Sequence, residues 1–215
     1  MRPLPAQAVR NTIRHGDCIP LMRRMDAASV DFILTDPPYL VNYRPRSGQR
    51  VANDNGNDWL QPAANGMYRV LKPDALCVSF YGWTQADQFI AAWRSAGFRL
   101  VGHIVFRKGY ASASGYLRGQ HEMAYLLAKG RPPKPKRPIG DVIDYPYTGN
   151  RLHPTQKPVE ALRPLIECFT QPGDLVFDPF LGSGSTLVAA AQLGREWLGI
   201  EIDETHHRTA RGRLE

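Results

Sequence analysis

The hydrophobic and polar positions of the chain follow two alternating patterns. Short apolar runs such as "VDFIL" and "ALCVSFY" predict buried strands, whereas "WLQPAANGMYRVL" and "QADQFIAAWRSAG" repeat their apolar residues at helical intervals. Further strands are predicted at NTIRH, DLVFDPF and EWLGIEID, and further helices at CIPLMRRM, PVEALRPLIECF, STLVAAAQL and from Thr205 onward. Strands and helices that alternate in this order predict a parallel α/β sheet.

Two regions depart from this alternation. "FRLVGHIVFRK" and "HEMAYLLAK" are predicted strands, and "GYASASGYLRGQ" between them has no helical pattern, so we expect the two strands to pair antiparallel. "GRPPKPKRPIGDVIDYPYTGN" is rich in proline and glycine and is predicted to be loop throughout. "LKPDA" is expected to separate a helix from the strand that follows it.

The composition indicates one globular domain. At 215 residues and 43% hydrophobic content, the chain is long enough to fill a core. Its three cysteines, Cys18, Cys77 and Cys168, form no CxxC pair, which argues against a zinc site and a disulfide framework and fits a reducing cytoplasm. We find neither a signal-peptide core nor a stretch of about 20 apolar residues, so we expect a soluble, untargeted, cytoplasmic protein with no membrane contact.

The net charge of +7 is concentrated in one segment. From Arg94 to Arg137 there are ten Lys and Arg residues and one acid, Glu122, so this segment carries +9 and the rest of the chain carries −2. A cationic block of this kind suits a polyanion such as nucleic acid. It is equally compatible with a solvated basic face that serves solubility.

The first candidate for a functional site is the tetrapeptide Asp36-Pro37-Pro38-Tyr39, which ends a buried strand. An Asp-Pro pair commonly begins a turn, so a strand followed by a stiff loop is the simplest interpretation. That interpretation does not explain why a second proline and an aromatic residue follow.

The second candidate is "DLVFDPFLGSGSTLVAAAQLGREWLGIEID". A strand ends at Asp178, a glycine-rich turn leads into a helix of small residues, and nineteen residues after Gly182 another strand ends at Glu201. In a βαβ unit this order places glycines where a ligand approaches the backbone and an acid where it can accept hydrogen bonds from ribose hydroxyls. The third glycine of the dinucleotide fingerprint is absent, which favours a cationic nucleoside over a pyrophosphate.

These residues resemble the amino-group DNA methyltransferases that use S-adenosylmethionine. The family's [D/N/S]PP[Y/F/W] tetrapeptide is matched by residues 36–39, and its FxGxG turn is matched by residues 180–184. "HGDC" before the first motif and "HPTQKPVEAL" before the second match the permuted subgroup called beta, in which the catalytic half precedes the cofactor half. Four motifs in the subgroup's order cover nearly the whole chain.

The resemblance implies a Rossmann-like methyltransferase fold of the α/β class, with a doubly wound, seven-stranded, mainly parallel sheet that includes one antiparallel strand. It implies a single domain over 1–215, with a catalytic half at 11–106, a short basic segment for DNA recognition at 107–152 and a cofactor-binding half at 153–215. S-adenosylmethionine is the expected cofactor, and no metal is expected. The expected cofactor-binding residues are Asp17 and Cys18 at the adenine, Glu201 at the ribose, Thr155 and Lys157 at the methionine carboxylate, and Asp178, Phe180, Gly182, Ser183 and Gly184 at the methionine end.

The resemblance also gives the tetrapeptide a physical role. The exocyclic amine of adenine or cytosine is a poor nucleophile because its lone pair is delocalised into the ring, and inside a duplex it is out of reach, so the base must be flipped out. Asp36 would accept one N–H and the Pro37 carbonyl the other, which turns the lone pair toward the sulfonium methyl. The two prolines fix φ and hold that carbonyl outward. Tyr39 would stack on the base, worth about 1–3 kcal/mol.

Contacts to double-stranded DNA are expected from loops, because the chain has little room for the larger target-recognition insert of typical relatives. The candidates for phosphate or base contact are Arg44, Arg46, Arg50, Lys108, Tyr116 and Arg118. We expect an adenine-N6 DNA methyltransferase of bacterial, phage or mobile-element origin, either monomer or homodimer. Cytosine-N4 methylation, an RNA base methyltransferase and a non-catalytic cofactor- or DNA-binding module are the alternatives. The sequence does not predict the recognition site or any partner endonuclease.

Overall fold

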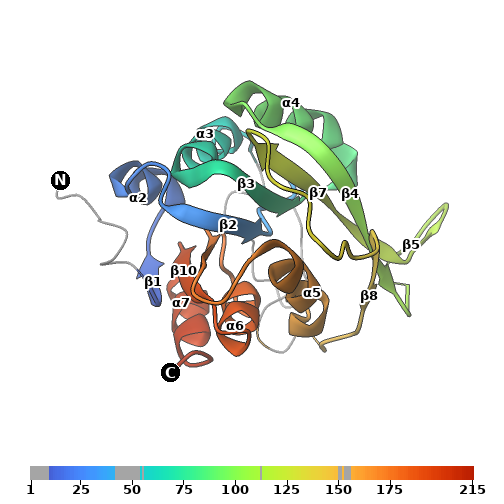
Figure 1. The fold of residues 1–215 in the computed structure, drawn as a ribbon. Coiled ribbons are helices and arrows are strands. Elements are labelled where there is room, and N and C mark those ends of the chain that lie inside the picture. The colour runs from blue at the N-terminus through green and yellow to red at the C-terminus, as the bar shows by residue number, and fades with distance from the viewer. Residues whose placement is uncertain (1–9, 42–53, 55, 112, 150–151, 153–155) are drawn as a thin grey trace.

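An eight-stranded sheet runs through the computed structural model, which describes residues 10–41, 54, 56–111, 113–149, 152 and 156–215 (Figure 1). Its strand order is β1-β10-β9-β2-β3-β7-β4-β8, and every neighbouring pair is parallel except those that β7 makes with β3 and β4. The strands are β1 (Thr12–His15), β2 (Val30–Thr35), β3 (Leu71–Phe80), β4 (Arg99–Lys108), β7 (His121–Lys129), β8 (Val142–Tyr145), β9 (Leu175–Asp178) and β10 (Glu196–Glu201).

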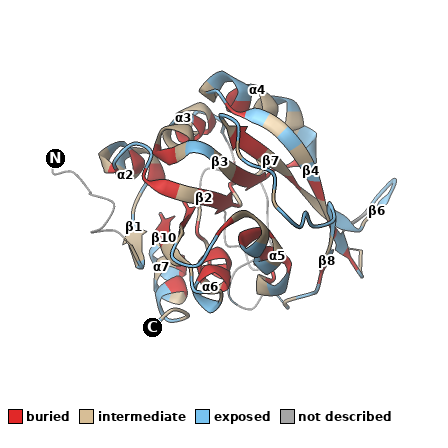
Figure 2. Cartoon of the chain, viewed as in Figure 1, coloured by how far each residue is buried: buried red, intermediate tan, exposed pale blue. Residues whose placement is uncertain are grey.

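Helices cover both faces of this sheet, so the sheet is doubly wound as expected. The α-helices are α2 (Cys18–Arg24), α3 (Leu60–Val70), α4 (Ala86–Ala96), α5 (Val159–Phe169), α6 (Ser185–Gln192) and α7 (Glu204–Arg211), and a 3-10 helix, η1, spans Trp83–Gln85. In β2, Ile33 belongs to the core shared with α2, α3 and α4, whereas Phe32 and Leu34 belong to the core shared with α5 and α6. Figure 2 shows the resulting buried residues on the strands between the two helical layers.

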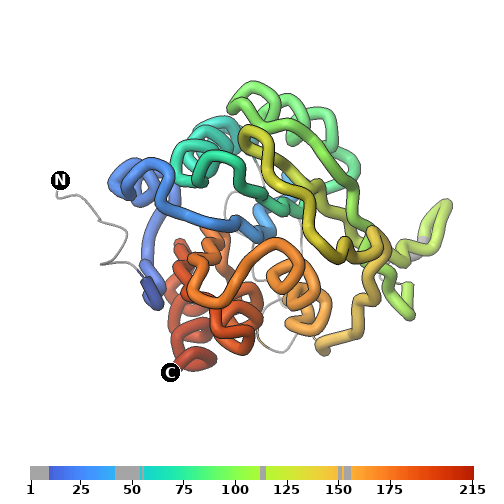
Figure 3. The backbone as a smooth tube through the Cα atoms, viewed as in Figure 1, coloured from blue at the N-terminus to red at the C-terminus, as the bar shows by residue number. Residues whose placement is uncertain are grey.

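The two ends of the described chain meet at one side of the molecule. β1 pairs in parallel with β10, the last strand of the sequence, and Figure 3 shows the first strand beside the C-terminal segment. The backbone N–H of Gly16 also donates to the Glu201 carbonyl at 2.8 Å. This pairing brings the loop after β1, with Asp17 and Cys18, next to the end of β10, which is compatible with the permuted motif order.

Three expectations about elements need correction. The segment predicted as continuous loop contains β8, whose register pairs it with the end of β4, so the sheet has eight strands where seven were expected. "LKPDA" is the beginning of β3 rather than a separator, and the register of β3 against β2 shifts there. "GYASASGYLRGQ" contains a small hairpin of β5 (Ala113–Ser114) and β6 (Arg118–Gly119), while β4 and β7 on either side pair antiparallel as predicted.

The carboxyl ends of the seven parallel strands meet at one edge of the sheet, together with the start of β7. The adjacent strands β2 and β9 mark the point where the chain changes from one helical layer to the other, because β2 continues into α3 and β9 into α6. In open α/β sheets, ligands bind outside the carboxyl ends of the strands at such a switch point. None of the helices within the described ranges is long and apolar enough to span a membrane.

Candidate active site

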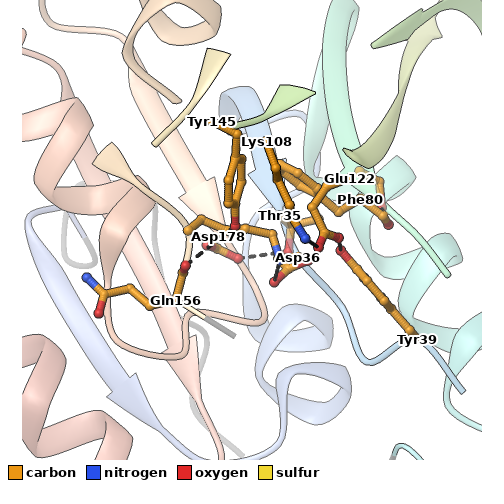
Figure 4. Close-up of polar contacts among 11 residues, drawn as sticks. Thr35, Asp36, Tyr39, Phe80, Lys108, Glu122, Tyr145, Gln156 and Asp178 are labelled. Atoms are coloured by element: carbon orange, nitrogen blue, oxygen red, sulfur yellow. Dashed lines mark hydrogen bonds and ion pairs between the residues drawn. The ribbon is translucent and has the colours of Figure 1, made fainter. Parts of the chain in front are cut away.

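The two sequence motifs come together at the switch point. The tetrapeptide follows β2 directly, and Asp178 ends the neighbouring β9. The Thr35 hydroxyl donates to Asp178 Oδ1 at 2.8 Å, so the last residue of β2 is bonded to the last residue of β9 (Figure 4). Two segments that lie more than 140 residues apart therefore form one site.

Asp36 has one oxygen occupied and one available. Its Oδ2 accepts from Lys157 Nζ at 2.5 Å. Its Oδ1 is buried and has no hydrogen-bond partner among the described residues. Burial raises the pKa of Asp36, and the Lys157 charge opposes that rise. A buried carboxylate oxygen without a partner calls for an explanation, and a ligand that donates to it is one.

Lys157 lies against the aromatic side chains of the site. Its Nζ is 5.3 Å from the centroid of the Tyr39 ring and 4.9 Å from that of Phe80, within cation–π range. Burial alone would lower the pKa of Lys157, but the nearby charge of Asp36 raises it, so this ammonium stays protonated. Lys157 was expected at the methionine carboxylate, and its observed partner is Asp36.

Tyr39 and Lys108 both bond to Glu122, for which the sequence analysis predicted no role. The Tyr39 hydroxyl donates to Glu122 Oε2 at 3.2 Å, and Lys108 Nζ donates to Glu122 Oε1 (Figure 4). Lys108 was expected on the surface, in contact with phosphate. That expectation is wrong, because its side chain is only 6% exposed and its ammonium is paired with Glu122 inside the site.

The glycine-rich turn is held by Glu201. The Gly182 N–H donates to Glu201 Oε2 at 2.7 Å and the Asp203 N–H to Oε1 at 2.8 Å. Gly184 has a φ of +85°, and a Cβ there would lie 3.1 Å from Ala210 Cβ, so both its backbone and its surroundings favour glycine. Ser183 is buried, and its carbonyl accepts from Arg213 at 2.6 Å.

Asp178 is a buried carboxyl group at the end of β9. Burial raises its pKa to about 7, although hydrogen bonds from Thr35 and the Phe180 N–H favour its charged form. The Phe180 ring packs edge-on against Trp59 at 5.1 Å between centroids. The buried Asp178 carboxyl group and this aromatic pair therefore both lie at the end of β9.

The expected adenine-contacting residues lie at the start of α2. Asp17 is the N-cap of this helix, and its Oδ1 accepts from the Ile19 N–H at 2.8 Å. Cys18 is buried, and burial raises the pKa of its thiol to about 12, which keeps it neutral. The loop lies beside β10 because β1 and β10 are paired.

The remaining expected residues divide into two groups. Tyr116 and Arg118 are exposed on the β5–β6 hairpin. Thr155, Arg44, Arg46 and Arg50 lie outside the residues that the structure describes.

Several contributors to the site were missed by the sequence-based reasoning: Thr35, Trp59, Phe80, Glu122 and Tyr145. For Glu122 a signal existed, because it is the one acid in a segment of +9 and stands at the start of a predicted strand. An isolated acid among cations on a buried strand indicates an internal ion pair.

Comparison with known proteins adds a family match. A family model described as DNA methylase, covering N6 and N4 methyltransferases, matches residues 30–212. The chain is 57% identical over 199 residues to "Putative methylase YubD" of Escherichia coli (strain K12), covering 93% of this chain and 88% of that protein. It is 27% identical over 245 residues to the DNA adenine methyltransferase YhdJ of the same strain, covering 95% and 82%.

Solved structures share the fold. The M1.HpyAVI–SAM complex superposes with a TM-score of 0.77 at 23% identity, covering 95% of this chain and 98% of that one. The cytosine-N4-specific PvuII DNA methyltransferase also gives a TM-score of 0.77, at 17% identity, covering 95% and 86%.

Proposed function

The chain belongs to the DNA methylase family of N6 and N4 methyltransferases, and from this premise we propose that it transfers a methyl group from S-adenosylmethionine to the N6 amine of adenine in DNA. The observation that carries the proposal is the buried, unpartnered Oδ1 of Asp36, located at the switch point of the sheet. Within the part of the chain that the structure describes, this oxygen has no hydrogen-bond donor, so we propose that it accepts an N–H group of the target base.

The surrounding residues fit S-adenosylmethionine, which supplies a methyl group on a positively charged sulfur. Asp178 would face the cationic methionine end, and Glu201 has lone pairs left for ribose hydroxyls after its bonds to Gly182 and Asp203. The glycine turn (Gly182, Ser183, Gly184) would contact the cofactor through its backbone. Phe180 would pack against it, and Asp17 and Cys18 would border the adenine. Thr155 would hold the methionine carboxylate, whereas the Lys157 ammonium is already bonded to Asp36.

The chain's own residues would prepare the target amine. Asp36 Oδ1 accepts one N–H, and the carbonyl of Pro37 accepts the second, which localises the nitrogen lone pair. Pro38 keeps the turn rigid, and the Tyr39 ring offers a face to the flipped base. The Asp36 carboxylate also stabilises the positive charge that develops on the nitrogen as the new bond forms.

The choice of adenine rests on similarity rather than on geometry. A carboxylate and a carbonyl would receive the amines of adenine and cytosine equally well. The similarity to the adenine methyltransferase YhdJ supports adenine, and the shared fold of the cytosine-N4-specific PvuII enzyme keeps cytosine N4 as the second candidate.

The test is the methylated nucleoside itself. Unmethylated genomic DNA is incubated with the protein and labelled S-adenosylmethionine, digested, and analysed by mass spectrometry, with the Asp36→Asn variant as control. We expect N6-methyladenine with the wild type only. N4-methylcytosine would replace the adenine assignment, and the absence of any methylated base would contradict the proposal.

A further inference from the structure

Glu122 bonds to the catalytic turn from a strand that belongs to neither motif. It is the second residue of β7, and its Oε2 accepts the hydroxyl of Tyr39 at 3.2 Å. The other oxygen accepts from Lys108, the last residue of β4. One carboxylate therefore connects the ends of two strands to the aromatic residue of the tetrapeptide, as Figure 4 shows.

Lys108 fixes the position of this carboxylate. Its Nζ lies 5.5 Å from the centroid of the Tyr145 ring and 5.9 Å from that of Tyr110, so aromatic faces enclose the ammonium. Burial alone would raise the pKa of Glu122, but the charges of Lys157 and Lys108 lower it, so Glu122 is ionised at neutral pH. A buried ion pair is often no more stable than apolar residues of the same size, so its presence calls for a reason other than stability.

The hydrogen bond to Glu122 restrains the side chain of Tyr39, the last residue of the tetrapeptide. Tyr39 is three residues beyond Asp36, and its ring has Lys157 at 5.3 Å from the centroid. Behind it, a Cβ at Gly82 would lie 2.7 Å from the Tyr39 carbonyl oxygen, so the turn packs closely against the segment after β3. The backbone is thus held by packing, and the free end of the phenol is held by Glu122.

We propose that Glu122 is a positioning residue for methyl transfer, which holds the Tyr39 ring through its hydroxyl so that the ring face stays available to the target base beside Asp36. Lys108 acts through Glu122 by fixing its carboxylate. The inference rests on the proposed function, and it names how the aromatic surface of that site is oriented. Removing either the acceptor at position 122 or the hydroxyl at position 39 should have the same effect on capture of the base.

A matched pair of variants separates the hydrogen bond from the ion pair. Lys108→Met/Glu122→Gln and Lys108→Met/Glu122→Leu both lack the buried charges and have similar volumes, but only the first keeps an oxygen that accepts from Tyr39. We expect the Gln variant to retain kcat/KM for DNA within a few-fold of wild type and the Leu variant to lose roughly 10- to 100-fold. Affinity for S-adenosylmethionine, measured by calorimetry, should be equal in the two.

The decisive comparison combines each of the two double variants with Tyr39→Phe. If Glu122 acts through the Tyr39 hydroxyl, the difference between Gln and Leu disappears there. A difference that persists in that background, or equal activity of Gln and Leu with Tyr39 present, would overturn the inference. A merely structural role would lower the melting temperature of both variants without separating their kcat/KM values.

A spectroscopic readout keeps the inference testable apart from methyl transfer. In protein labelled with 3-fluorotyrosine, the ¹⁹F signal of Tyr39 is assigned by its loss in Tyr39→Phe. We expect this signal to match wild type in the Gln variant and to shift or broaden in the Leu variant. Identical Tyr39 signals in the two variants would overturn the positioning role even in an active enzyme. A wild type that methylates no DNA would contradict the proposed function alone, and the ¹⁹F comparison would still decide the role of Glu122.

Discussion

Asp36 is the residue whose replacement separates chemistry from binding. Asp36→Asn keeps an oxygen for Lys157 but weakens the acceptor that faces the amine, so we expect methyl transfer to fall by about 100- to 1,000-fold. S-adenosylmethionine affinity should remain within a few-fold of wild type because none of the cofactor contacts proposed above involves Asp36. Single-turnover transfer of labelled methyl groups and calorimetry measure the two quantities. Undiminished transfer by this variant would rule out the proposed acceptor role.

Asp178 gives a prediction about pH. Burial raises its pKa to about 7, so the carboxyl is neutral below that pH and attracts a cationic methionine end only above it. Cofactor affinity should therefore rise with pH, and at pH 6, where only about a tenth of Asp178 is ionised, it should be about tenfold weaker than the plateau. Asp178→Asn should bind weakly and without this step between pH 6 and 7.5. A variant that keeps the step would assign it to another group.

The sequence reveals a site residue when the neighbouring residues in the chain indicate its role. The Asp36 tetrapeptide and the Gly182 turn are contiguous, so their chemistry was visible in the residue order. Lys108 was misjudged because its environment comes from register: β4 ends beside the start of β7, which places Lys108 close to Glu122. A lysine in a basic stretch gives no local sign that a partner across the sheet buries it.

At the scale of elements, the hydrophobic pattern predicted the helices and seven of the eight main strands. β8 was missed because its four residues stand in a proline- and glycine-rich stretch and their pairing is with the distant β4. The beginning of β3 was misplaced because Pro73 lies within it and Asp74 has a φ of +55°, which is unusual for a strand. Both errors concern backbone pairing that apolar periodicity does not encode.

The β5–β6 hairpin is an element with an exposed apolar tip beside the site. Tyr116 is fully exposed and Leu117 is 85% exposed. At the base of the hairpin, the Lys108 N–H donates to the Gln120 carbonyl at 2.8 Å, which ties it to the edge where Glu122 and Tyr39 meet. Exposed aromatic side chains can stack on nucleic-acid bases, so we propose that Tyr116 contacts DNA beside the candidate active site.

We therefore expect Tyr116→Ala/Leu117→Ala to raise the dissociation constant for DNA by about tenfold, the usual worth of one stacked base, with no change in cofactor affinity. Val101→Ala is the matched control, because Val101 is a half-exposed apolar residue toward the opposite end of β4. Fluorescence anisotropy with a labelled duplex measures the effect. An equal effect of the control would show that the hairpin has no special contact with DNA.

At the scale of the whole molecule, the segment of +9 is not one cationic face. Lys108 is buried against Glu122, Arg107 pairs with Asp144, and Lys129 donates to the carbonyls of Tyr68 and Leu71. Arg118 is exposed on the hairpin at the carboxyl edge of the sheet. Arg131 follows β7 at the opposite edge, where its backbone N–H donates to Asp74 Oδ1 at 2.6 Å. The sum of charges predicts attraction to DNA, and the fold decides which cations can reach it.

This division predicts how salt acts on DNA binding. Each phosphate neutralised by a cation releases counterions, so the logarithm of affinity should fall linearly with the logarithm of salt concentration, by about 0.9 per contact. Arg118→Glu should make that slope shallower by about 1, because Arg118 stands at the same edge of the sheet as the candidate active site. Arg131→Glu changes the net charge equally but at the far edge, and should lower affinity at low salt only slightly while leaving the slope unchanged. Titrations of one labelled duplex at several salt concentrations give all three slopes. Equal flattening by both variants would mean that DNA also contacts the opposite edge, and a salt-independent affinity would assign the basic segment to solubility instead.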